Sequence, residues 1–93
     1  MKIGVLRVYF MIFNARSLKE KRTVLKSIKD RLANTFNVSV AEIGSNDKWQ
    51  LGEIGLATVG NDAKFVSSVL DEVKKFLESN PAIRIIEADA EVI

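Results

Sequence analysis

Apolar and polar positions alternate in the first part of the chain. From Lys2 to Phe13 the sequence is rich in Val, Ile, Phe and Tyr, a composition that favours a strand. The side chains of a strand alternate between its two faces, so one set of positions is predicted to meet the core. That set is the even one, which is uniformly apolar: Leu6, Val8, Phe10 and Ile12.

A helical pattern follows this strand. The residues from Ser17 to Glu20 match a capping box, in which the Ser17 hydroxyl accepts the Glu20 amide and the Glu20 side chain reaches back. A helix is therefore predicted from Leu18 to about Phe36. Its apolar stripe recurs at helical spacing and consists of Leu18, Val24, Leu25, Ile28, Leu32 and Phe36.

Two more strands and a turn are predicted in the middle of the chain. Val38 to Ile43 favours a strand, and Gly44 to Asp47 favours a turn. Gln50 to Val59 favours a third strand, although Gly52 and Gly55 weaken its strand propensity.

The last third of the chain predicts a helix and a closing strand. Asn61 or Asp62 caps a helix that runs to about Ser79, where Asn80-Pro81 ends it. The apolar face of this helix consists of Phe65, Val66, Val69, Leu70, Val73 and Leu77. The closing strand, Ile83 to Val92, alternates an apolar face with an acidic one. The apolar face consists of Ile86, Ala88, Ala90 and Val92.

The predicted order of elements is β-α-β-β-α-β. With right-handed crossovers, this order favours an α+β ferredoxin-like sandwich, in which two helices cover one face of a four-stranded antiparallel sheet. With 93 residues, the chain is expected to form a single domain, 1–93.

Composition narrows the possible chemistry. The chain has no Cys and no His, so it lacks a thiol nucleophile, a zinc–thiolate site and the commonest general base. Its carboxylates form no catalytic or metal-ligand spacing, and its glycines form no phosphate-binding loop. We therefore expect no catalytic residues, no metal site, no cofactor and no enzymatic activity.

The apolar start of the chain does not predict a membrane segment. Residues 1–13 are interrupted by Arg7 and are too short for a spanning helix, which needs ~20 residues. The expected location is the cytoplasm.

Several motifs together resemble the YlxP-like family of small bacterial proteins, a domain of unknown function. They are Gly4 to Val8, Arg16 to Arg22, Phe36 to Glu42, Asp47, and Trp49-Gln50. The resemblance covers essentially the whole chain and implies a ferredoxin-like fold. Members tend to be encoded near translation-initiation and ribosome-maturation factors, which implies an RNA- or ribosome-associated role. The family offers no agreed catalytic residues.

Basic residues concentrate on the first predicted helix. Residues 16–31 contain seven basic and two acidic residues, a net charge of +5, whereas the whole chain carries +2 and the remainder therefore −3. At 100° per residue, Lys19, Arg22, Lys26 and Lys29 line one stripe away from the apolar face. With Arg16, they are the candidate nucleic-acid-binding residues, and a ribosomal subunit or structured RNA is the candidate partner.

Three interpretations of this stripe stay open: a solvated helix face, a contact with RNA, and a contact with an acidic protein. An RNA-recognition module of the same topology stacks bases on aromatic residues of its central strands. Here the third strand has no aromatic residue, and Tyr9 alone faces outward on the first. Backbone contacts through the helix remain the expected nucleic-acid mode.

The face of the sheet without helices predicts a second kind of interaction. Its expected apolar residues include Val5, Tyr9, Met11, Leu51 and Ile85. Because monomers rarely leave a large contiguous apolar patch open, these residues are the candidate interface of a homodimer. The alternative function is thus a homo-oligomeric interaction module with no nucleic-acid partner.

The sequence also predicts the surroundings of two individual residues, Lys21 and Trp49. Lys21 falls at the centre of the helix's apolar face, so its ammonium is expected to pair with an acid from a neighbouring strand or turn. Trp49, the only Trp, is expected to close the end of the core, or otherwise to contact a partner.

Overall fold

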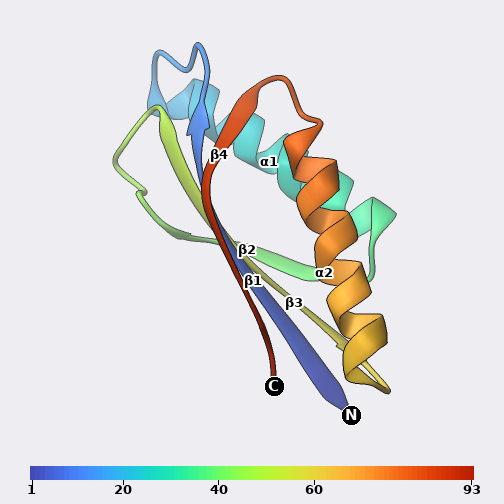
Figure 1. The fold of residues 1–93 in the computed structure, drawn as a ribbon. Coiled ribbons are helices and arrows are strands. Elements are labelled where there is room, and N and C mark those ends of the chain that lie inside the picture. Colours follow the sequence, from blue (N-terminus) through green and yellow to red (C-terminus); the bar gives the residue numbers. More distant parts are fainter.

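The computed structural model describes all of residues 1–93 as four strands and two helices (Figure 1). The elements are β1 (Lys2–Ile12), α1 (Leu18–Thr35), β2 (Ser39–Gly44), β3 (Leu51–Gly60), α2 (Ala63–Glu78) and β4 (Ile83–Val92). The strands form one antiparallel sheet in the order β2-β3-β1-β4. Both helices lie on the same side of this sheet. The predicted ferredoxin-like α+β fold is confirmed.

The core lies between the sheet and the two helices. The even positions of β1 are all buried, with exposures of 0–2% from Leu6 to Ile12, as the alternation predicted. They pack against Leu25, Ile28 and Leu32 of α1 and against Leu70, Val73 and Leu77 of α2. In the sheet, α1 comes closest to β2, whereas α2 lies over β1, β3 and β4. Neither helix is long and apolar enough to cross a membrane.

Side-chain caps begin both helices. The Glu20 amide donates to the Ser17 hydroxyl over 3.1 Å, as the capping box predicted. The Glu20 carboxylate reaches one residue further back than expected and accepts from the Arg16 amide at 3.2 Å. In α2, Asp62 is the cap, and its carboxylate accepts from the Phe65 amide at 2.8 Å.

A β-bulge overturns part of the prediction for β4. Ile85 lies opposite Phe10, and Glu87 lies opposite Tyr9, so Ile86 has no partner on β1. The bulge shifts the alternation by one residue. Ile85 therefore packs against the core, and the prediction that it faces outward is wrong. Ile86, predicted to be buried, is 51% exposed.

Phe65 also departs from the predicted apolar face of α2. It stands in the first turn of the helix and is 57% exposed, while Val66 beside it is fully buried.

Lys21 is the one charged residue inside the core. Only 1% exposed, it lies on the buried side of α1, and its ammonium donates to the Ser45 carbonyl. The Glu42 carboxylate on β2 lies 3.6 Å from the same nitrogen. The expected pairing with an acid of a neighbouring strand is confirmed. These contacts compensate the ammonium for its lost hydration and tie α1 to β2 and the following turn.

Shortening Lys21 tests how much this contact stabilises the fold. Lys21→Ala removes buried methylene groups and a hydrogen-bond donor, so we expect it to lower the free energy of unfolding by about 2–4 kcal/mol. Lys21→Met retains the apolar stem and should lower it by about 1–2 kcal/mol. Urea unfolding followed by circular dichroism measures both, with the exposed Lys74→Ala as the control. Equal losses from the two Lys21 variants would contradict a packing role for the stem.

Candidate functional site

The predicted basic stripe lies on the solvent side of α1. Lys19, Arg22 and Lys26 are exposed, and Lys29 is half-buried at the edge of the helix–sheet contact. Arg16 is exposed just before the helix begins. The helical spacing therefore placed Lys19, Arg22 and Lys26 correctly on the solvent side, with Lys21 turned inward, whereas Lys29 is half-buried.

Most of these cations have no partner within the chain. The side chains of Arg16, Lys19, Arg22 and Lys29 make no ion pair, since no carboxylate lies within 4.0 Å of them. Lys26 is the exception, because its ammonium lies 2.7 Å from the Asp30 carboxylate one turn later. The hydrogen bond to Asp30 and the negative charge of Asp30 raise the pKa of Lys26. The free positive charge of the stripe is thus that of Arg16, Lys19, Arg22 and Lys29.

Acidic residues gather on the opposite side of the molecule. The uncovered face of the sheet presents Glu53 from β3 and Glu87 and Asp89 from β4, which line a shared hollow with Arg7. The Arg7 guanidinium lies 3.6 Å from the Glu53 carboxylate and offsets part of this charge. The α1 helix and the open sheet face therefore present opposite charges, which agrees with the excess of +5 calculated for residues 16–31.

The open sheet face also has an apolar hollow across β1, β3 and β2. Small and branched residues line most of it, among them Val5, Ala41, Ile43, Gly55 and Ala57. Ile43 is 48% exposed and lies over Gly55, where an added Cβ would meet its side chain at 3.2 Å.

Four of the five predicted interface residues lie on this side. Val5, Tyr9 and Leu51 are half-buried there, and Met11 is 37% exposed. Val5 pairs with Ala57, and Met11 pairs with Leu51, which places them at different ends of the β1–β3 ladder. The fifth residue, Ile85, belongs to the core. The predicted set therefore includes two separate patches, one around Val5 and one around Met11, and Tyr9 lies between them in the hollow that Arg7, Glu53 and Glu87 line.

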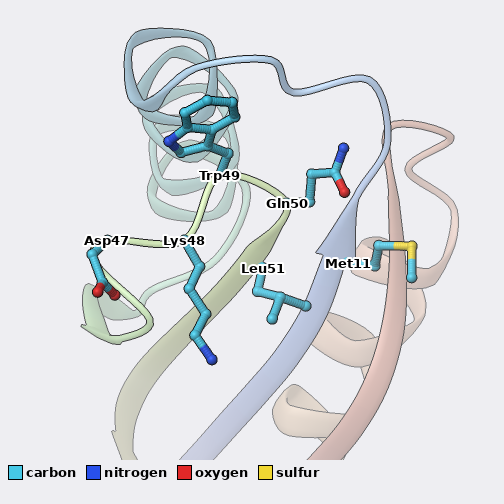
Figure 2. A pocket seen from close by; sticks show the side chains of 6 residues that line it. All are labelled: Met11, Asp47, Lys48, Trp49, Gln50 and Leu51. Atoms are coloured by element: carbon cyan, nitrogen blue, oxygen red, sulfur yellow. The ribbon is translucent and has the colours of Figure 1, made fainter.

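The second patch is an open hollow of about 570 Å³ beside Trp49. Met11, Leu51 and Trp49 supply its apolar walls, and Asp47, Lys48 and Gln50 its polar ones (Figure 2). The Trp49 side chain stands out from the loop between β2 and β3 and is 52% exposed. The expectation that it closes the end of the core is therefore wrong.

Hydrogen bonds hold this loop against the start of α1. The Gln50 carbonyl accepts from the Ile12 amide at 2.8 Å, and the Gln50 side chain donates to the Ala15 carbonyl at 3.5 Å. At the other end of the loop, Lys21 binds the Ser45 carbonyl. The hydrogen bond between Gln50 and Ala15 thus joins the loop that carries Trp49 to the segment that precedes Arg16.

Sequence reasoning did not find the hollow as a unit. Its apolar members come from β1, β3 and the loop, and only the antiparallel register brings Met11 opposite Leu51. The available signal was a lone Trp after a polar turn, followed by an apolar residue at the start of a strand.

Comparisons with known proteins agree with the motifs. Residues 3–90 match the sequence model of a family described as "Protein of unknown function (DUF503)". The chain is 43% identical over 81 residues to the "Uncharacterized protein YlxP" of Bacillus subtilis (strain 168). That alignment covers 87% of this chain and 88% of the Bacillus protein. The resemblance to the YlxP-like family is confirmed, and neither description assigns an activity.

The exposure of Trp49 predicts a small contribution to stability. Trp49→Ala should lower the free energy of unfolding by about 1 kcal/mol or less, because half of the side chain already contacts water. Phe10→Ala, at a fully buried position, should lower it by about 3–5 kcal/mol. Urea unfolding followed by circular dichroism compares the two variants. A loss for Trp49→Ala as large as that for Phe10→Ala would restore the core-closing role.

Proposed function

We propose that this chain, which belongs to the DUF503 family of proteins of unknown function, is a cytoplasmic protein that binds structured RNA through α1. The observation that carries the proposal is the row of cations on the solvent side of α1 with no carboxylate partner: Arg16, Lys19, Arg22 and Lys29. A ribosomal subunit is the expected partner, and the role is one of binding rather than catalysis.

The spacing of these cations supports a polyanionic partner. Lys19 and Arg22 lie three residues apart on the helix, about 5–6 Å at Cβ, so their like charges repel each other in the free protein, and Lys29 follows two turns later. A phosphate backbone carries negative charges at comparable intervals and relieves this repulsion.

The expected mode is contact with the phosphate backbone. Such contacts fix the position of a protein on a nucleic acid and carry little sequence information. The acidic open sheet face repels phosphate, which directs the RNA to α1. The charge separation between α1 and the open sheet face would thus orient the protein on its target.

The second candidate is a homo-oligomeric interaction module. The apolar hollow around Val5, Ile43 and Ala57 favours it, because apolar surface of this kind is typical of contacts between proteins. In that case the cations of α1 would serve only as a solvated face.

Two charge-reversed variants test the proposal. Arg22→Glu/Lys29→Glu reverses two charges of the stripe and changes the net charge of the whole protein from +2 to −2. Lys64→Glu/Lys74→Glu makes the same change in the net charge of the protein, but at two positions of α2. The wild type should bind an RNA hairpin with a log–log salt slope of about −3 to −4. The α1 variant should lose affinity for every RNA sequence tested and flatten the slope by about two, whereas the α2 variant should lose much less. Fluorescence anisotropy at several salt concentrations measures all three proteins.

Co-sedimentation with ribosomal subunits at low and moderate salt gives the independent readout. Wild-type protein that shows no salt-sensitive binding to subunits or to hairpins would overturn the RNA proposal. If the α1 and α2 variants lost RNA affinity equally, the binding would be a nonspecific effect of net charge, and the α1 site would be overturned. Analytical ultracentrifugation then tests the second candidate, which requires a self-associated species.

A further inference from the structure

We infer that Trp49, with Met11 and Leu51, forms a stacking site for one unpaired nucleobase of an RNA bound to α1. The inference rests on the proposed function and deepens it, because it specifies RNA in which a duplex adjoins a single-stranded nucleotide. The phosphate contacts of α1 and the base contact of Trp49 involve different residues, so they can be tested separately.

The hollow suits a flat aromatic ring. The Trp49 indole is 52% exposed and stands out from the loop, and Met11 and Leu51 line the same hollow (Figure 2). Met11 and Leu51 are neighbours in the β1–β3 ladder, and Met11 is itself 37% exposed. An aromatic ring that stacks on the indole would cover apolar surface that the chain leaves in contact with water.

Polar groups around the hollow suit a base better than a purely apolar ligand. Asp47, Lys48 and Gln50 line the same hollow, so an amide, a carboxylate and an ammonium are available to the edge of a base. A base offers both an apolar face and hydrogen-bonding edges, as this mixture requires. Lys48 also supplies a positive charge for the phosphate of the same nucleotide.

The position of the loop joins the hollow to the basic stripe. The hydrogen bond from Gln50 to Ala15 holds the residue after Trp49 against the residue before Arg16. A strand whose phosphates contact Arg16 can therefore continue towards the loop that carries Trp49. Aromatic residues beside a basic track are the usual arrangement for binding single-stranded nucleic acid, because every base has a face that can stack.

A second copy of this chain fits the hollow less well. The apolar surface there is small and is divided from the Val5 patch by Arg7, Glu53 and Glu87, which line a hollow between the two patches. A partner surface would have to bury these charges to reach both patches, at a large desolvation cost. A single base needs only the Trp49 hollow.

Two RNA ligands separate the base contact from the phosphate contacts. One is a blunt-ended RNA hairpin, and the other is the same hairpin with a short single-stranded extension. Wild-type protein should bind the extended hairpin about ten-fold more tightly, within the range that stacking of one base provides. The extended hairpin should also quench the fluorescence of Trp49, which is the only Trp.

Variants of Trp49 locate the effect. Trp49→Ala should lose the preference for the extended hairpin while its affinity for the blunt one and its salt slope stay unchanged. Trp49→Phe retains an aromatic face and should keep most of the preference. Phe65→Ala is the matched control, because Phe65 is 57% exposed at the other end of β3, and it should keep the full preference.

Four other results of these experiments would overturn the inference, and they differ in what they leave of the proposed function. Equal affinity of the wild type for the two hairpins would overturn the stacking site and leave the α1 proposal intact. Equal weakening of both ligands by Trp49→Ala would make Trp49 a general contact rather than a base site. A wild-type dimer that Trp49→Ala dissociates would assign the hollow to a second copy. Absence of binding to either RNA would overturn the proposed function together with the inference.

Discussion

The burial of a single ammonium group determines how α1 meets the sheet. Lys21 is 1% exposed, and a charge at such a position is tolerated only where nearby oxygen atoms replace its water. The Ser45 carbonyl and the Glu42 carboxylate do so, and they lie on β2 and on the turn that follows it. Because β2 is also the strand that α1 approaches most closely, this contact sets the position of the helix and of the loop up to Trp49.

The same helix thereby separates two kinds of cation. The positive charge of Lys21 is compensated inside the protein, whereas Arg16, Lys19, Arg22 and Lys29 keep theirs on the surface. Lys26 belongs to neither group, since Asp30 already pairs with it. The charge available to a partner is therefore smaller than a count of basic residues suggests, because Lys21 and Lys26 are already paired.

Local periodicity predicted most of the fold, because the relevant information lies within each element. The alternation in β1 and the 100° spacing in α1 identified the buried faces, and the cost of an isolated charge identified the pairing of Lys21. The errors arose where distant segments decide the outcome. The bulge at Ile86 depends on pairing with β1, and Trp49 stands in the loop between β2 and β3, where neither helical nor strand periodicity applies.

The bulge has a further consequence for the edges of the sheet. In the order β2-β3-β1-β4, β4 is an outer strand whose far side has unpaired backbone groups, which are a template for the addition of another strand. The bulge at Ile86 interrupts the regular backbone of this strand midway. If the β4 strands of two copies paired in antiparallel fashion, the carboxylates of Glu87, Asp89 and Glu91 would lie close to those of the other copy and repel them. The irregularity and the acidic residues together protect this protein from edge-to-edge aggregation.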